Sequence, residues 1–506
     1  MTAVARHDAP LDKGLKRGAL GFVSSVVIGV ASTAPGYSLA ASLGLVTAVA
    51  GIGFAAPAIM WLAFVPMLFV AAGYYYLNKN DPDCGTTFSW ATRAFGPATG
   101  WLGGWAIIVA DVIVMANLAA IAGSYTFLLF GADKAAASKW WVLAVGVGWI
   151  AVMTFICYVG IEVSARTQWF LLAAEVVTLT VFAVVAIAKV YSSHPSGAAR
   201  PSLKWLDPFT ISSTSALTAG LLVAVFIYWG WDTLVAVNEE TQDATRIPGI
   251  AALVSTIVLL AIYVGVSVAA QAFHGPGFLT KNASDILSAL GKDVLGSPWN
   301  KLLIIAVLTS ASASTQTTIL PTARTALSMA THRALPQHFG RIHPRFRTPG
   351  PATLWMGALS IAWYVGLTIA SQNILTDSID ALGLMIAFYY GMTGYACAWY
   401  YRRHLLDSPR NFVLVGVVPV TGAAILTWLF VKSIINLSNP ANTSTGSNWA
   451  GLGAPIWIGV GALALGLVLM TLQWSADRSF FRRRTETGDP ALELKTEPAG
   501  AAAAGS

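Results

Sequence analysis

The chain has 506 residues, of which 56% are hydrophobic and only 10% are charged. Because soluble domains carry roughly 25% charged residues, this composition excludes an ordinary soluble globular fold. The net charge of +7 does not indicate nucleic-acid binding, because the basic residues are distributed over short segments between long apolar blocks.

The apolar blocks are long enough for helices that cross a hydrocarbon core of roughly 30 Å. We therefore predict an all-α integral membrane protein with about 12 transmembrane helices. The predicted spans are approximately 21–49, 52–77, 97–130, 140–161, 166–190, 214–238, 250–273, 301–329, 352–371, 379–402, 411–436 and 451–475.

Basic residues predict how the chain lies in the membrane. With the N-terminus inside, the predicted inward segments hold 21 of the 30 Lys and Arg residues. Because positive charge is retained on the cytoplasmic side, we expect a multi-pass inner-membrane protein with both termini in the cytoplasm. The predicted divisions are a cytoplasmic N-terminal segment (1–20), a transporter domain (21–480) and a disordered cytoplasmic tail (481–506) that lacks apolar area to bury.

Two predicted spans are interrupted near the middle of the membrane. The first contains Pro35 and Gly36, and the sixth contains Gly230 followed by Asp232. Proline removes a backbone donor and clashes with the preceding turn, while glycine adds backbone freedom. Either interruption alone is more typical of a simple kink.

The two interruptions occupy corresponding positions, because the first and sixth spans each lead a group of five. We predict an inverted repeat, with repeat one at about 21–190, repeat two at about 214–402 and two additional C-terminal helices at about 411–475. Broken helices at matching positions in two halves indicate the binding site of a transporter.

Three loop motifs carry a resemblance to a known family. Residues 82–97 read PDCGTTFSWATRAFGP, and residues 238–248 read NEETQDATRIP. Near the end of the eighth span, Arg324 is followed by ALP at 334–336 and IHPRFRTP at 342–349. In this order and placement, the motifs resemble those of the amino acid–polyamine–organocation permeases, over most of residues 15–480.

The resemblance implies a secondary transporter in which broken helices 1 and 6 hold the substrate and helices 3, 8 and 10 line the path. Two departures from the family pattern occur. The first break reads STAPG instead of a G-[ST]-G type sequence, and Glu175 stands where many members have a lysine in helix 5. The inverted charge puts any lysine-based coupling mechanism in doubt.

The predicted substrate site combines backbone and aromatic groups from the two breaks. Amides at the N-terminus of the second half-helix would attract a substrate carboxylate, and the preceding carbonyls would accept from an ammonium group or a cation. Aromatic rings of the sixth span suit apolar side chains and ammonium groups, although packing is an equal alternative for each ring. The candidate residues are Ser32, Thr33, Ala34, Gly36, Phe226, Tyr228, Trp229, Gly230 and Trp231.

Three acidic residues lie well inside predicted spans, where charge is costly and usually functional. Asp111 and Glu175 fall roughly 16 Å and 14 Å into their helices. Asp111 is a candidate partner for a substrate amine, Glu175 a candidate proton carrier, and Asp232 a candidate inner-gate residue. The alternative for each is a protonated or hydrogen-bonded structural acid.

Hydroxyl groups in the eighth span offer a second coupling site. Ser310 and Ser314 are four residues apart and share a helix face. In sodium-coupled relatives of this architecture, such hydroxyls and helix 1 carbonyls bind the ion, and hard cations favour oxygen ligands. Close helix packing by small residues is the more conservative interpretation.

Other functional classes fit the sequence less well. Repeated filter loops of a channel, a metal-ligand pair of histidines on one span and a G-x-x-x-x-G-K-[ST] nucleotide motif are all absent. A transporter-like sensor remains an alternative. No disulfide framework or metal cluster is expected from Cys84, Cys157 and Cys397.

We therefore predict an amino acid transporter that works by alternating access, with proton-coupled symport or exchange, no cofactor and no enzymatic activity. A proton, or else sodium, is the expected coupling ion, and the lipid bilayer is the expected surrounding. An amine or polyamine permease of the same architecture is the alternative. The sequence sets neither the direction of transport nor the oligomeric state.

Overall fold

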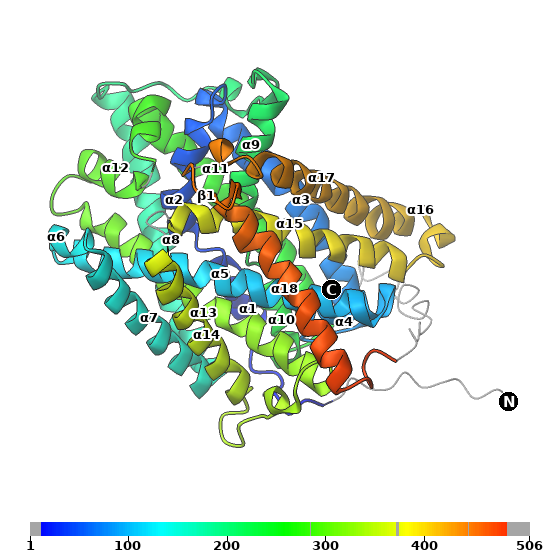
Figure 1. The fold of residues 1–506 in the computed structure, drawn as a ribbon. Coiled ribbons are helices and arrows are strands. Elements are labelled where there is room, and N and C mark those ends of the chain that lie inside the picture. The colour runs from blue at the N-terminus through cyan, green and yellow to red at the C-terminus, as the bar shows by residue number, and fades with distance from the viewer. Residues whose placement is uncertain (1–11, 284, 371–373, 444, 483–506) are drawn as a thin grey trace, which may run out of the picture.

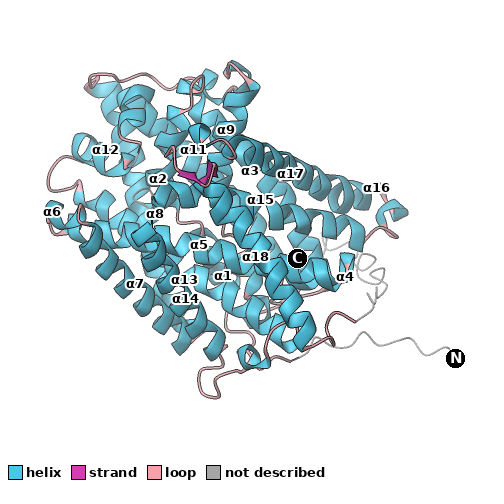
Figure 2. Cartoon of the chain, in the orientation of Figure 1, coloured by secondary structure: helices cyan, strands magenta, loops and turns pink. Residues whose placement is uncertain are grey.

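A computed structural model describes residues 12–283, 285–370, 374–443 and 445–482. These residues form a bundle of helices with a single short β-hairpin among them (Figures 1 and 2). The predicted all-α membrane fold is confirmed. Most of the predicted disordered tail and the first half of the predicted N-terminal segment lie outside the described residues.

The first five predicted spans are all helical, and the first of them is divided into two helices. Long apolar runs favour helix here because every backbone polar group must be satisfied within the segment. The helices are α1 (Phe22–Ser32), α2 (Pro35–Ala48), α3 (Ala56–Asn80), α5 (Pro97–Leu129), α7 (Lys139–Val159) and α8 (Ile161–Ser192).

The sixth to tenth predicted spans follow, and the sixth is again divided in two. The helices are α9 (Thr214–Ile227), α10 (Thr233–Ala236), α11 (Ile247–Lys281), α13 (Lys301–Thr331), α14 (Gly350–Ala370) and α15 (Ile374–Tyr400). Two further helices correspond to the predicted C-terminal pair, α17 (Val418–Leu437) and α18 (Ala454–Ala476).

Among the described residues, eleven helical segments are long and apolar enough to cross a membrane, and each matches one predicted span. The sixth span differs, because α9 has only 14 residues before the chain leaves the helix. The seventh is predicted to end at 273, and α11 indeed bends at Gly275 (φ 71°) before continuing to Lys281.

Short elements connect the long helices. They are α4 (Thr87–Phe95), α6 (Asp133–Ala136), α12 (Ile286–Leu295), α16 (Pro409–Asn411), a π-helical turn (Phe412–Val417) before α17, and strands β1 (Asn448–Trp449) and β2 (Leu452–Gly453). The strands pair antiparallel, with Asn448 opposite Gly453. Single 3-10 turns occur at Gly53–Ala55, Leu203–Leu206, Pro208–Thr210, Asn238–Glu240, Gln337–Gly340, Leu405–Asp407 and Pro440–Asn442.

The bundle is layered around two central helices. Helices α5 and α13 pack against each other and are largely buried, together with α1 and α2, whereas α7, α8, α17 and α18 form the periphery. In Figure 1, α18 crosses the front of the bundle, while α15 and α17 run side by side at its right edge.

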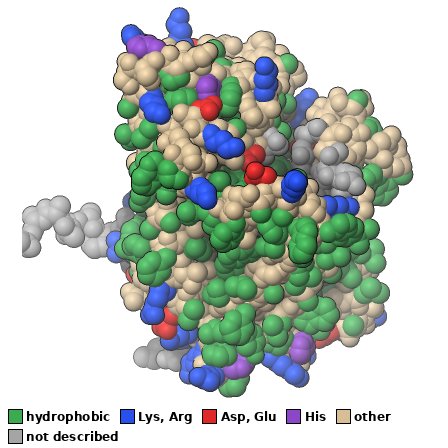
Figure 3. Space-filling view, turned by 90° about the vertical axis from the view of Figure 1, so that its left-hand side faces the viewer, with side chains coloured by type: hydrophobic (Ala, Val, Ile, Leu, Met, Phe, Trp, Pro, Cys, Tyr) green, Lys and Arg blue, Asp and Glu red, His purple; other side chains and the backbone are tan. Residues whose placement is uncertain are grey.

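The outer surface is apolar. Large hydrophobic side chains such as Phe170 and Phe155 are 74% and 65% exposed. Figure 3 shows a broad belt of hydrophobic side chains, with most Lys, Arg and His side chains above and below it. Because an exposed apolar belt between polar borders matches a lipid bilayer, the molecule is a multi-pass membrane protein.

Candidate functional site

The first helix break lies at Thr33 and Ala34. Ala34 adopts a left-handed conformation (φ 48°), and α2 begins at Pro35, which suits the first helical position because its missing N–H needs no partner there. The same missing donor prevents α1 from continuing through this point. The break predicted from Pro35 and Gly36 is therefore confirmed.

The second break runs from Tyr228 to Asp232 and lies directly against the first. Gly230 has a φ of 113°, and a Cβ atom there would lie 2.8 Å from the carbonyl oxygen of Ser32. Glycine thus permits both the left-handed turn and the close backbone approach. Beside it, the hydroxyls of Ser32 and Thr233 lie 2.8 Å apart.

The N-terminus of α2 receives a carboxylate from inside the protein. The amide of Gly36 donates to Glu175 Oε1 at 2.6 Å, and the amide of Tyr37 donates to Ser310 Oγ at 3.0 Å. A helix N-terminus favours a carboxylate oxygen as hydrogen-bond acceptor, and the side chain of Glu175 supplies that oxygen here. The structure therefore joins Glu175 on α8 and Ser310 on α13 to the first break.

The other backbone groups of the first break also have partners within the protein. The amides of Thr33 and Ala34 donate to carbonyls of the preceding turn, and Ser314 Oγ donates to the Ser32 carbonyl oxygen at 2.9 Å. The conformation described is thus one in which the groups predicted to hold a substrate are occupied by side chains and backbone of the chain itself.

Asp232 is held by two tyrosines of α15. Tyr389 Oη donates to Asp232 Oδ2 at 3.1 Å, and Tyr390 Oη donates to Oδ1 at 2.8 Å. Trp229 Nε1 in turn donates to Tyr389 Oη. Asp232 is 6% exposed, so these phenolic donors provide most of its solvation.

Asp111 faces α13 and also lies near this group. Thr322 Oγ1 donates to Asp111 Oδ2 at 2.5 Å. The carboxyl groups of Asp111 and Asp232 are close enough to interact electrostatically. Two predicted acids thus share one region between α5, α10, α13 and α15.

The predicted aromatic residues do not line a single wall. Phe226 meets Tyr37 edge-on at 6.2 Å between ring centroids, whereas Tyr228 packs against Tyr263 of α11 at 5.0 Å. Trp231 packs against Tyr74 of α3 at 5.0 Å. Among the described residues, Trp229 is the one predicted aromatic side chain that hydrogen-bonds to a tyrosine holding Asp232.

A charged cluster closes one end of the bundle, at the predicted cytoplasmic side. Lys13 Nζ lies 2.9 Å from Asp83 Oδ2 and 2.5 Å from Glu239 Oε1, and its side chain is 2% exposed. Arg324 donates twice to Glu240, at 2.8 Å and 3.0 Å. We call these five residues the Lys13–Arg324 cluster.

Electrostatics in this cluster favour the charged forms of Lys13 and Asp83. Burial alone would lower the pKa of Lys13, but Asp83 and Glu239 outweigh burial and hold that pKa well above its usual value. Burial alone would raise the pKa of Asp83, but Lys13, with His332 and Ser328, outweighs burial and holds that pKa well below its usual range. Burial raises the pKa of Glu239 despite Lys13.

The three cysteines form no disulfide within the described chain. Cys84, Cys157 and Cys397 are free and buried. Cys84 lies near Asp83 and Glu239, with ligand atoms within 4.8 Å of one another. The ammonium group of Lys13 contacts both carboxylates, so a cationic side chain already fills the place that a metal ion would need.

Sequence reasoning missed Lys13, Tyr390 and the Arg324–Glu240 pair. Lys13 belongs to a polar N-terminal segment that resembles a solvated tail, and Tyr390 was not distinguished from its aromatic neighbours. A signal existed for Arg324: an arginine within a predicted span needs a partner, and two glutamates follow the sixth span.

Comparison with known proteins agrees with this geometry. The family model described as amino acid permease matches residues 18–463. An uncharacterised transporter of Mycobacterium tuberculosis is 27% identical over 425 residues, covering 82% of this chain and 87% of that protein.

Characterised relatives are more distant. A low-affinity putrescine importer of Escherichia coli is 21% identical, covering 77% of this chain and 82% of that protein. A serine/threonine exchanger of Bacillus subtilis is 21% identical, covering 76% and 83% respectively. The family match spans both broken helices and the three acids Asp111, Glu175 and Asp232, and the chain belongs to the amino acid permease family of membrane transporters.

Proposed function

We propose that the chain is a secondary active transporter that moves an amino acid across the cytoplasmic membrane by alternating access. The observation that carries the proposal is the bond from the Gly36 amide to Glu175, at the point where the two broken helices touch. A helix N-terminus that binds an internal carboxylate can bind the carboxylate of an amino acid in its place.

This exchange of carboxylates supplies a coupling mechanism. An ionised Glu175 accepts a charge-assisted hydrogen bond from Gly36, and protonation weakens that bond because the carboxyl loses its charge. A substrate carboxylate then competes better for the amide. Protonation of Glu175 would therefore promote substrate binding, as proton-coupled symport or exchange requires.

Sodium is the second candidate coupling ion. The hydroxyls of Ser310 and Ser314 and the carbonyl of Ser32 are oxygen ligands of the kind that hard cations use. In the described conformation, however, Ser310 accepts from Tyr37 and Ser314 donates to Ser32. A sodium ion would have to replace these bonds, so we favour the proton.

Uptake by proteoliposomes tests both parts of the proposal. We expect saturable uptake of at least one labelled amino acid, stimulated when the lumen is made alkaline. Glu175→Gln should retain binding and lose the stimulation by the proton gradient. Glu162→Gln is the matched control, because Glu162 lies on the same helix and is 52% exposed in a pair with Lys16.

Three outcomes would contradict parts of the proposal. Unchanged pH dependence in Glu175→Gln would exclude this residue as the proton carrier. A requirement for sodium would replace the proton as the coupling ion. A folded protein that neither takes up nor exchanges any amino acid or amine would favour a sensor.

A second candidate, an amine or polyamine permease, is favoured by one observation. The mid-membrane acids Asp111 and Asp232 have hydrogen-bond donors but no ion pair with Lys, Arg or His among the described residues. A cationic amine could neutralise them. If diamines without a carboxylate compete for uptake and Asp111→Asn removes that competition, this candidate replaces the amino acid.

A further inference from the structure

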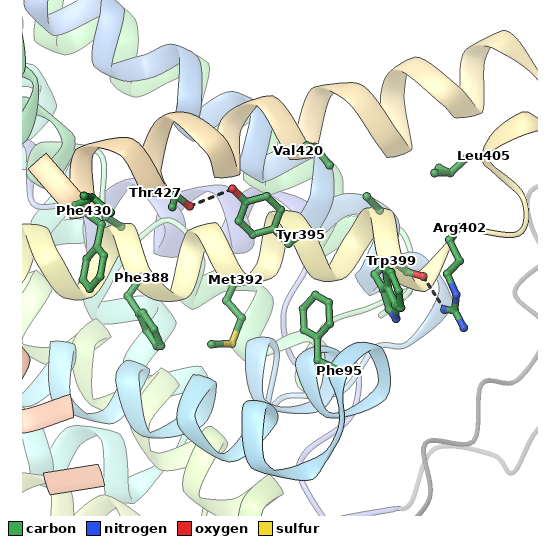
Figure 4. Close-up of a pocket in the computed structure, with 13 residues that line it drawn as sticks. Phe95, Phe388, Met392, Tyr395, Trp399, Arg402, Leu405, Val420, Thr427 and Phe430 are labelled. Carbon is green, nitrogen blue, oxygen red and sulfur yellow. Dashed lines mark hydrogen bonds between the residues drawn. The ribbon is translucent and has the colours of Figure 1, made fainter. Parts of the chain in front are cut away.

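A groove on the outside of the bundle runs between α15 and α17, away from the helix breaks. Its volume is about 880 Å³. Figure 4 shows Phe388 and Met392 of α15, Phe430 of α17 and Phe95 of α4 pointing toward it. These side chains offer carbon surface over most of its length, so the occupant must be largely apolar.

The groove opens toward the bilayer. Trp399 and Val431, which line its two ends, are 50% and 48% exposed. From Phe388 to Trp399 the helix rises roughly 17 Å, close to half of a roughly 30 Å hydrocarbon core. An acyl chain in one leaflet has a matching length.

At one end of the groove lies an arginine whose guanidinium group has hydrogen-bond donors left for a ligand. Arg402 donates one N–H to the Trp399 carbonyl at 2.8 Å, and its guanidinium lies 4.8 Å from the Trp399 ring. Within the described chain, no carboxylate forms an ion pair with it. The remaining guanidinium donors match the oxygens of a phosphate.

The position of Arg402 also indicates which leaflet of the bilayer the charged end of the groove faces. Arg402 lies just after α15 and near Phe95 of α4. Tyr400, two residues before it, accepts a hydrogen bond from Asn80, which precedes Asp83 of the Lys13–Arg324 cluster by three residues. Basic residues predict this end to be cytoplasmic, and basic pockets between membrane helices on that side bind anionic headgroups.

We propose that this groove is a binding site for an anionic phospholipid of the cytoplasmic leaflet. The acyl chain lies between α15 and α17, and the headgroup phosphate accepts hydrogen bonds from Arg402. Because the opposite face of α15 carries Tyr389 and Tyr390, which hold Asp232, the lipid braces the helix that contacts the second break.

Lipid binding to the purified full chain tests the site without knowledge of the substrate. Phosphatidylglycerol and phosphatidylcholine with identical acyl chains are titrated in detergent, with native mass spectrometry for retention and thermal unfolding for stability. We expect phosphatidylglycerol to bind about five-fold more tightly, as one basic contact predicts, and to raise the unfolding temperature more.

Variants separate the headgroup contact from the groove. Arg402→Gln should abolish the preference for phosphatidylglycerol, whereas the control Arg403→Gln should keep it, because Arg403 does not line the groove. Val431→Trp should fill the groove and weaken binding of both lipids. Arg402→Lys should keep part of the preference, since it retains the charge but not the planar set of donors.

Several results would overturn the proposal. Equal retention of the two lipids by the wild-type protein would exclude headgroup recognition, even if every variant failed to fold. An unchanged preference in Arg402→Gln would place the headgroup elsewhere. Rapid disulfide-linked dimers of Val431→Cys in phosphatidylcholine nanodiscs would show that a second copy of the chain covers the groove.

Discussion

Two buried groups of carboxylates in this molecule are stabilised in different ways. In the Lys13–Arg324 cluster, Asp83 and Glu239 pair with Lys13, and Glu240 pairs with Arg324. In the middle of the bundle, the donors that the described residues offer to the carboxyl groups of Asp111, Glu175 and Asp232 are hydroxyl and amide groups.

The difference separates a structural role from an exchange role. The charge of a buried carboxylate with a cationic partner is compensated, and removing either member of the pair leaves an uncompensated charge. A buried carboxylate with neutral partners still needs a proton or an external cation. The first arrangement holds a conformation, while the second suits a site that binds and releases a cation during transport.

The largest expected effect comes from removing one member of the Arg324–Glu240 pair. Both side chains are fully buried, so Arg324→Ala should destabilise the protein by about 3–5 kcal/mol, because Glu240 remains as an unpaired buried charge. This loss of stability can be measured by thermal unfolding in detergent, with the amount of monodisperse protein as the readout.

The double variant Arg324→Gln/Glu240→Gln is the control for this comparison. It removes both charges, and we expect it to recover part of the lost stability. If the double variant were as unstable as Arg324→Ala, shape and packing, not charge compensation, would explain the pair.

A smaller loss is expected for Lys13→Met, at about 2 kcal/mol. Asp83 keeps three hydrogen bonds without Lys13, from the Gly85 amide and from the hydroxyls of Ser89 and Ser328. The other partner of Lys13 is Glu239, whose side chain is 14% exposed, so water can solvate its carboxylate when Lys13 is absent. The variant Lys16→Met removes an exposed ion pair and should change the unfolding temperature little.

The charged state of the Lys13–Asp83 pair should be insensitive to pH near neutrality. The raised pKa of Lys13 makes its contribution fully present below its usual pKa, and the lowered pKa of Asp83 makes its contribution present above its usual pKa. If the loss of stability in Lys13→Met varied strongly between about pH 6 and 8, a titrating group other than this pair would be responsible for the loss.

The smallest effect concerns Asp81, which has features of both groups. Its Oδ1 pairs with Arg93 at 2.8 Å, but its buried Oδ2 has no partner among the described residues. Burial, opposed by Arg93, raises the pKa of Asp81 to about 6. Folding therefore favours the protonated form of this carboxyl.

The sign of the resulting pH dependence follows from proton binding. Between about pH 4 and 6 the folded state binds more protons at Asp81 than the unfolded state, so this residue adds stability as pH falls through 6. Asp81→Asn should remove that gain, about 1 kcal/mol between about pH 7 and 5, as measured by a series of unfolding temperatures across this pH range. Asp12→Asn, at an exposed pair with Arg17, should leave the series unchanged.

Local chemistry made the breaks predictable. Pro35 cannot continue a helix and Gly230 can adopt a positive φ, so both interruptions follow from single residues. The cost of burying charge marked Asp111, Glu175 and Asp232 as candidate functional residues, and all three are buried in the structure. Which donors these acids meet depends on how separate helices pack, and that is why the bond from Gly36 to Glu175 was not foreseen.

The Lys13–Arg324 cluster could not be predicted from local sequence either, because it also depends on how distant segments pack. Lys13 is 70 residues from Asp83 and 226 from Glu239 along the chain. In addition, Leu20 and the segment around Thr241 form a parallel β-bridge. Such contacts arise only when the complete bundle forms, since no periodicity in residues 12–20 marks them.

Cys84 gives the molecule a natural chemical reporter. It is buried in the same cluster: its amide donates to Glu239 at 3.0 Å and its Sγ donates to the Arg324 carbonyl at 3.5 Å. If the bundle alternates as proposed, opening of this end would expose the thiol to water-soluble alkylating reagents, while Cys157 and Cys397 would stay packed between helices as unreactive references. The alkylation rate of the wild-type chain would thus count openings of one side of the transporter directly.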